Sequence, residues 1–321
     1  MPQTTRSKRP KDRIGGSPVV TLAGSKANCY LTTPGFSGQV ISVGSQSAYI
    51  RTDDDNILAA CRLDQQPHPR SFLTDLRSLN LQEGMKVWVE DSQLRFSGEL
   101  AIPLRDCQVW NRERLERSDT APIQQFRSRC SELMQTTSEI HRGENLGLAL
   151  SYLANNGDTT SLPTDTSPLV AAGIEQIRRL IPLCRSGDLG SVLRNAEQLI
   201  GLGPGLTPSG DDFIGGFLFM AYHLSSAYPS ELEWNVGEAE MFLLRSESKT
   251  SRISFALLTD LAGGQSHESL HDLVDGLMSR TQDFDAAALV RRVTEIGHSS
   301  GWDMLTGMVA GTLPVMRRAW A

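Results

Sequence analysis

Hydrophobic and polar residues alternate with a period of two through the first third of the chain. Short apolar runs such as 39–43, 57–61 and 85–89 are separated by turn-forming residues between Pro18 and Trp110. This alternation is typical of half-buried β-strands. The sequence therefore predicts a β-rich domain over residues 18–114, built as a small barrel or sandwich.

Beyond residue 115 the apolar residues recur at the spacing of an α-helix. Residues 123–134 place Ile, Phe, Cys, Leu and Met on one helical face, and further apolar stripes occur in 192–200, 253–261 and 305–313. Such stripes mark the buried faces of amphipathic helices. We therefore expect a mainly helical domain over residues 115–321, and an α+β fold for the chain as a whole.

Two segments follow neither pattern. Residues 1–17 carry five basic residues and no apolar run, which predicts a disordered basic tail and not a secretory signal. Residues 155–168 are polar and contain proline, so they are expected to form a linker or an insertion. The longest apolar stretch, 213–224, is too short to cross a hydrocarbon layer of ~30 Å, and no transmembrane segment is expected.

Composition narrows the classes of partner. The 321 residues are 39% hydrophobic and 21% charged, with a formal net charge of −6. An acidic chain of ordinary composition argues against a nucleic-acid surface and favours small molecules or proteins as partners. The five cysteines are odd in number and form no Cys-x-x-Cys pair, which indicates a reducing compartment and predicts a cytoplasmic location.

A glycine-rich loop stands out in the helical half. Residues 201–212 read Gly-Leu-Gly-Pro-Gly-Leu-Thr-Pro-Ser-Gly-Asp-Asp, directly before an apolar run. Gly203 and Gly205 permit positive φ and close approach of a ligand, while the prolines stiffen the loop. Ser209 is the expected N-cap of the following helix, with Asp212 at the capping-box position. A glycine-rich turn that opens a helix is suited to binding phosphate or carboxylate.

The same pattern recurs near the C-terminus. Residues 209–216 and 300–307 share the pattern Ser-Gly-x-Asp-apolar-apolar-x-Gly. Each copy can cap a helix, and its last glycine leaves a bare surface against which another helix can pack. We hypothesise that the two helix starts meet at one site. The alternative is a pair of ordinary capping boxes on unrelated helices.

The acidic residues of the first copy suggest a cation. This loop lacks the lysine of a nucleotide-binding P-loop and has Asp211 and Asp212 in its place. A phosphate bound here would be repelled unless a cation bridged it to the carboxylates. Mg²⁺ fits, because it accepts one or two carboxylates together with water and substrate oxygens. In the alternative interpretation both aspartates only complement the helix dipole.

Two further clusters could contact an anionic substrate. Lys249, Thr250 and Arg252 lie where another helix begins, and they could hold carboxylate or phosphoryl oxygens. A solvent-facing first turn is the alternative there. His298 precedes the second motif copy and could carry a proton beside Asp303, although a loop histidine is often only part of a polar surface.

Together these residues resemble a known family. The loop at 201–212, the segment 250–254 and the run Gly-His-Ser-Ser-Gly-Trp-Asp at 297–303 are similar to the AllH-type subunit of oxamate carbamoyltransferase. The likeness extends over residues 190–316, while the basic tail and the insertion depart from the compact family pattern. The resemblance implies a cytoplasmic, three-subunit enzyme of anaerobic allantoin breakdown. Such an enzyme interconverts oxalurate plus phosphate with oxamate plus carbamoyl phosphate, and Mg²⁺ is the implied cofactor.

The chemistry of that reaction suggests a role for each motif position. Carbamoyl transfer places negative charge on phosphate and on a tetrahedral oxyanion, so the site needs oriented donors and a cation. The predicted catalytic residues are His298, Asp303 and Ser300; the predicted substrate-binding residues are Gly203, Gly205, Thr207, Ser209, Lys249, Thr250, Arg252 and Ser299; the predicted metal ligands are Asp211 and Asp212.

Two other classes of function remain open from the sequence. The chain could be a non-catalytic subunit that binds phosphate or serves as a scaffold, with the chemistry on partner subunits. It could also be a self-sufficient Mg²⁺-dependent hydrolase or transferase that acts on another small anionic substrate.

Overall fold

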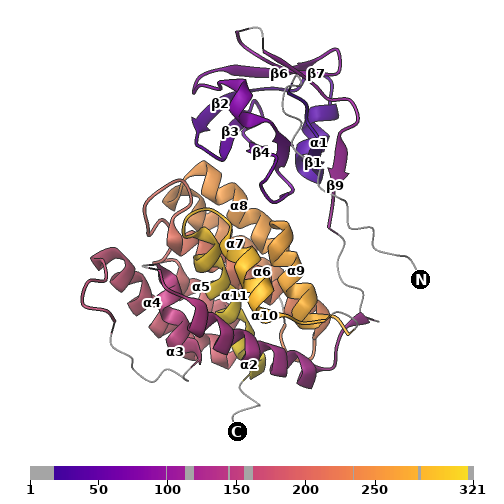
Figure 1. The fold of residues 1–321 in the computed structure, drawn as a ribbon. Helices are drawn as coiled ribbons and strands as arrows, with labels where there is room; N and C mark the ends of the chain where they lie inside the picture. Colours follow the sequence, from indigo (N-terminus) through magenta and orange to yellow (C-terminus); the bar gives the residue numbers. More distant parts are fainter. Residues whose placement is uncertain are drawn as a thin grey trace. The chain divides into compact units, whose positions relative to one another are not determined.

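A computed structural model describes residues 18–98, 100–112, 119–143, 145–154, 162–233, 235–280 and 283–316. The chain forms two compact units (Figure 1), one from residues up to 65 together with 70–110, and one from residues 66–69 together with 111 onward. The predicted basic tail 1–17 and the predicted boundary at 114–115 lie outside the described residues. The predicted insertion at 155–168 is described only from residue 162.

The first unit is a nine-stranded sheet with the strand order β8-β7-β6-β2-β3-β4-β5-β1-β9. Most neighbouring strands are antiparallel, while β4 with β5 and β1 with β9 are parallel. A helix, α1 (Ser25–Thr32), follows the first strand, and a 3-10 turn, η1 (Leu76–Leu79), follows the fifth. The strands are β1 (Leu22–Gly24), β2 (Ser37–Val43), β3 (Ser47–Thr52), β4 (Ile57–Arg62), β5 (Ser71–Thr74), β6 (Lys86–Glu90), β7 (Gln93–Phe96), β8 (Ala101–Pro103) and β9 (Gln108–Trp110).

The period-two pattern explains how this sheet curls around a core. Along β3, Ala48 and Ile50 are buried while their neighbours in the strand are partly exposed, as expected for a sheet with one covered face. The N–H of Val20, just before β1, donates to the carbonyl of Pro103 in β8 at 3.4 Å. This bond links segments from opposite ends of the strand order, and the sheet closes into a half-barrel. The predicted β-rich character of the first part of the chain is confirmed.

The second unit is helical, as the 3.6-residue period predicts. Together with the first unit it confirms the predicted α+β class. Among the described residues, no helix combines the length and the apolar character that a membrane crossing requires. The helices are α2 (Ile123–Ile140), α3 (Leu150–Ala154), α4 (Pro168–Ser186), α5 (Leu189–Ala196), α6 (Ser209–Ala227), α7 (Val236–Ser246), α8 (Arg252–Ala262), α9 (Glu268–Met278), α10 (Ala286–Thr294) and α11 (Ser300–Met316), with the 3-10 turns η3 (Leu146–Ala149) and η4 (Glu247–Lys249).

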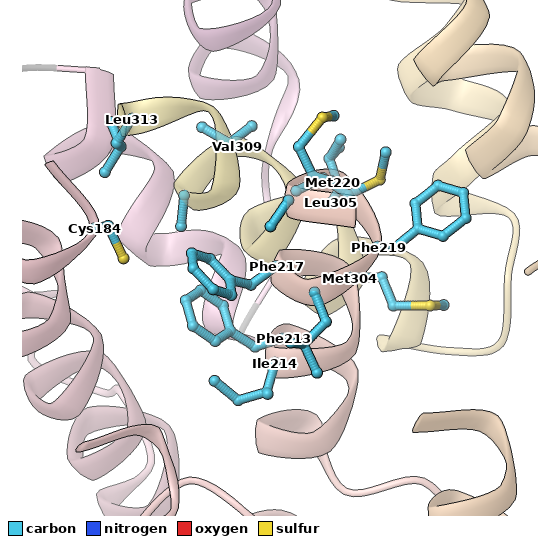
Figure 2. Packing of buried hydrophobic residues seen from close by; sticks show 14 of the residues in the cluster. Cys184, Phe213, Ile214, Phe217, Phe219, Met220, Met304, Leu305, Val309 and Leu313 are labelled. Carbon is cyan, nitrogen blue, oxygen red and sulfur yellow. The ribbon is translucent and has the colours of Figure 1, made fainter. Parts of the chain in front are cut away.

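Helices α6 and α11 form the centre of this unit and pack along each other, with α4, α8 and α10 against them (Figure 1). Figure 2 shows Phe213, Phe217 and Met220 of α6 close to Leu305 and Val309 of α11. Both helices are buried on nearly every side, which is why their sequences are mostly apolar after the first turn and show no polar stripe.

The last glycine of each motif copy lets these two helices approach closely. A Cβ atom placed on Gly216 would lie 2.0 Å from the carbonyl oxygen of Met304, and one placed on Gly307 would lie 1.8 Å from that of Phe213. The contact is reciprocal, because Phe213 and Met304 occupy the same position in the two copies. Only glycine allows this separation, so the repeated motif builds a helix pair with approximate two-fold symmetry.

Candidate functional site

The two motif copies meet where α6 and α11 begin. The hydroxyl of Ser300 in the second copy bonds the carboxyl group of Asp212 in the first, and the hydroxyl of Ser209 bonds that of Asp303. Thr207, in the glycine-rich loop, lies with its Oγ1 3.1 Å from the Oγ of Ser300. The serine of each motif copy therefore forms a hydrogen bond with the aspartate of the other copy. The structure brings together the two helix starts that the repeated motif marks.

The N-terminal cap of α6 differs from the predicted one, because Ser209 and Asp212 form hydrogen bonds with the other motif copy. The N-cap residue of α6 is Pro208, which makes no side-chain cap, and its carbonyl accepts the N–H groups of Asp211 at 3.0 Å and Asp212 at 3.1 Å. The prediction that Ser209 caps this helix with Asp212 in a capping box is wrong. The side chains of Ser209 and Asp212 bond the other motif copy instead, because α11 lies close enough to compete for them.

Asp212 and Asp303 are both withdrawn from solvent, with 6% and 0% of their surfaces exposed. Burial raises the pKa of Asp212 well above its usual value, and the nearby charges of Asp303 and Asp211 raise it further. Burial also raises the pKa of Asp303 to about 6, even though Ser209, Ser299 and the N–H of Leu146 donate hydrogen bonds to it. Within the described residues, the Oδ2 atom of each of these two carboxyl groups has no hydrogen-bond partner.

Asp211 has a different environment. Its Oδ1 accepts the N–H of Gly201 at 2.6 Å, while its Oδ2 accepts the hydroxyls of Thr250 and, at 2.6 Å, of Ser254. Both carboxylate oxygens are thus used to join the start of the loop to the start of α8. Because both oxygens of Asp211 already accept hydrogen bonds from the chain, this environment does not favour a metal ion at Asp211. Among the residues that the structure describes, no group of three or more His, Cys, Asp or Glu side chains is arranged to hold one.

The glycine-rich loop is shaped by backbone conformations that glycine favours. Gly203 has φ 132°, and a Cβ atom there would lie 2.5 Å from the backbone nitrogen of Ser209. Gly205 has φ 94° and has open space around it, so the loop crest faces solvent. The N–H of Gly210 donates to Leu202 O at 2.8 Å, and the next two amides of α6 bond Pro208. These first-turn amides are therefore satisfied inside the chain, and an anion would have to use the loop amides and the hydroxyls.

The charged candidates lie at the edge of this region. Lys249 pairs with Glu197 at 3.0 Å, and Glu197 also pairs with Arg245 at 2.5 Å, so the lysine belongs to a surface ion-pair cluster. Arg252 is the exposed first residue of α8, and His298 is exposed in the turn before α11. The structure thus leaves Arg252 and His298 accessible from solvent.

The segment before η3 is a further contributor to the site, which the sequence analysis did not predict. The N–H of Leu146 donates to Asp303 Oδ1 at 2.9 Å, while the Asn145 side chain accepts the N–H of Gly147 at 2.8 Å. The Asn145 Oδ1 also lies 2.9 Å from a ring nitrogen of His141, whose ring packs edge-on against Trp302 at 4.7 Å. An asparagine ahead of a short apolar run signals a local cap. The contact with Asp303 spans 157 positions and has no such local signal.

Residues 199–312 match the family model described as oxamate carbamoyltransferase subunit AllH. The matched region begins just before the glycine-rich loop and ends within α11, so it contains both motif copies. The resemblance drawn from the motifs is confirmed over these residues. No solved structure matches the chain.

Proposed function

We propose that this chain is a subunit of an oxamate carbamoyltransferase and takes part in carbamoyl transfer between oxalurate or oxamate and phosphate during allantoin degradation. The family match supports the coarse assignment, since it covers the loop and both helix starts. One observation supports the location of the site: the two Ser-Gly-x-Asp copies meet, with Thr207 of the loop beside Ser300.

The hydroxyls and loop amides are proposed to receive the phosphate. Thr207 and Ser300 have neighbouring hydroxyl groups beside the loop, and both also bond the Asp212 carboxyl group, so donation to phosphate requires that they leave Asp212. The N–H groups of Gly203 and Gly205 lie in a loop with positive φ, a backbone type that forms anion-binding concavities. Donors held in place before the reaction stabilise charge that develops on phosphate and on the carbamoyl oxygen.

The exposed charged residues are proposed to act on the carbamoyl donor or acceptor. Arg252 can receive the oxamate carboxylate through two parallel hydrogen bonds. When a phosphate oxygen bonds the carbamoyl carbon, the bond from that carbon to the oxamate nitrogen breaks, and His298, in the turn before α11, can give a proton to this leaving nitrogen or accept it in the reverse direction. The ammonium group of Lys249 is paired with Glu197. Binding of a substrate by Lys249 would require the loss of that pair.

The same exposure favours a site that partner subunits complete. Gly205, Arg252 and His298 all face solvent, whereas catalytic groups that stabilise charge work best when water is excluded. In a second version of the proposal, this chain binds phosphate or positions its partners while the reacting groups lie on another subunit. A stand-alone Mg²⁺-dependent hydrolase or transferase has no comparable observation in its favour.

The test is an assay of the chain alone and in complex with its co-expressed partner subunits. Carbamoyl phosphate formed from oxalurate and phosphate is followed for wild type, Ser300→Ala and His298→Asn in this subunit. We expect the complex to be active, and each variant to lower kcat on the order of 10²-fold. Ser131→Ala is the matched control, because its hydroxyl lies on an exposed part of α2 and donates to Arg127 O within its own helix.

The outcomes separate the two versions. Variants that assemble normally and retain full activity would place the chemistry on a partner subunit. An assembled wild-type complex that forms no carbamoyl phosphate in either direction would reject the carbamoyltransferase assignment itself.

A further inference from the structure

The start of the α6–α11 pair contains two buried carboxyl groups that come from different helices and share one neighbourhood. Asp212 and Asp303 occupy the same position in the two motif copies, and the charge of Asp303 acts directly on Asp212. A third carboxylate, Asp211, adds to the negative charge there. Grouping like charges away from water is costly unless a proton or a cation offsets them.

Each of the two carboxyl groups has one buried oxygen that accepts no hydrogen bond from the described residues. Asp303 Oδ1 accepts the N–H of Leu146, and hydroxyls from Ser209 and Ser300 reach across the pair, but Asp212 Oδ2 and Asp303 Oδ2 are buried without a partner among the described residues. Buried polar atoms are rarely left unsatisfied in native proteins. Two such atoms, on carboxyl groups from the two helix starts that meet here, are oxygens that a bound cation could satisfy.

We propose that Asp212 and Asp303 bind a hard divalent cation of the Mg²⁺ type between the starts of α6 and α11. Mg²⁺ commonly takes only one or two carboxylates and completes its shell with water and substrate oxygens. Of the adjacent pair Asp211 and Asp212 that the sequence suggested, Asp211 is committed to Gly201, Thr250 and Ser254. One carboxylate comes from each motif copy.

The helix packing would hold this pair in place before the cation arrives. Gly216 and Gly307 fix how closely α6 and α11 approach, and each lies four residues, about one helical turn, after an aspartate of the pair. Backbone contacts therefore set the separation of the two helices that carry these carboxylates. A bound cation would also let an anion approach a region that is otherwise negative.

The proposal is tested on the full chain with metal alone. Binding of Mn²⁺ is measured from the loss of the free-ion electron paramagnetic resonance signal, and Mg²⁺ is then added as competitor. We expect wild type to bind one Mn²⁺ that Mg²⁺ displaces, and Asp212→Asn and Asp303→Asn to bind at least about tenfold more weakly. Asp285→Asn is the matched control, since that aspartate caps α10 through Ala288 N–H and asparagine caps as well.

Thermal unfolding provides a second readout that does not depend on Mn²⁺. In EDTA, removing one of two mutually repelling carboxylates should leave the Tm of either variant equal to or above that of wild type. At saturating Mg²⁺ the Tm of wild type should rise by about 5 °C or more, while neither variant responds. A low Tm in EDTA would show that a variant is destabilised, and Ser300→Ala, with intermediate Mn²⁺ affinity expected, then replaces it.

The proposal is overturned if wild type binds no divalent cation. It is also overturned if folded aspartate variants bind the cation as wild type does. In either case a shared proton is left as the compensating charge. The proposal stands apart from the proposed function, because metal binding by the isolated chain requires no carbamoyl transfer. An inactive complex with an intact cation site would refute only the function.

Discussion

Replacing Gly307 by alanine tests whether close approach of α6 and α11 holds the helical unit together. The new Cβ atom would lie 1.8 Å from the carbonyl oxygen of Phe213 and 2.8 Å from the backbone nitrogen of Phe217, whereas ordinary contact begins at 3.4 Å. The obstacle is helix backbone on both sides, which cannot rotate away as a side chain can. The helices must therefore separate locally by about 1.6 Å, the difference between the ordinary and the observed approach.

The cost follows from the packing that this separation disrupts. A radial gap of about 1 Å forfeits up to half of the dispersion energy of each contact that opens, and overpacking a core by itself costs about 1–3 kcal/mol or more. Alanine returns at most about 1 kcal/mol through its higher helix propensity. Because Phe213, Phe217 and Met304 all lie at the contact, we expect a net loss of at least about 3 kcal/mol.

Scanning calorimetry and urea unfolding measure this loss. For a unit of this size, a loss of about 3 kcal/mol lowers Tm by roughly 6–12 °C. Gly237→Ala is the control: Gly237 lies in the first turn of α7, where the nearest atom to a new Cβ is 3.5 Å away, so its Tm should stay equal or rise slightly. Gly307→Ala with the stability of wild type would refute the interpretation that the repeated glycines exist for helix contact.

Two further predictions concern buried ionisable groups. Burial lowers the pKa of His267 to about 4 and that of His271 to about 3, so both stay neutral in the folded chain while they protonate near pH 6.5 when unfolded. These two histidines therefore contribute a loss of stability as pH drops from 6.5 toward 4, while the raised pKa values of Asp212 and Asp303 act in the opposite direction. Between pH 7 and pH 5 the urea midpoint of wild type should fall relative to that of a His267→Gln/His271→Gln variant, and equal changes in the two proteins would contradict this. Burial also raises the pKa of the Cys184 thiol to about 12, whereas Cys29 is exposed. Iodoacetamide at pH 8 should alkylate Cys29 and leave Cys184 unmodified until urea is added, as peptide mass analysis would show; equal labelling of the native protein would count against the buried position.

The fold class could be predicted from the sequence because both periodicities are local. Alternating residues such as those of 47–52 form half-buried strands, and the fully apolar run after Asp212 forms a helix that is buried on all sides. The order of the nine strands has no such signal, since it depends on which strands pair across long loops. The half-barrel was therefore expected only as a barrel or a sandwich.

For the site, the sequence by itself determined which residues are candidates, namely the glycine-rich loop and the repeated Ser-Gly-x-Asp pattern. It also determined the family that these residues resemble. The tertiary structure alone decided what their side chains do. Ser209 bonds Asp303 and does not cap its own helix, Asp211 is used to join the loop to α8, and Leu146 supplies a donor to Asp303. A local pattern limits the backbone conformation of a few residues, whereas the partner of a buried polar atom depends on distant segments that folding brings within hydrogen-bond distance.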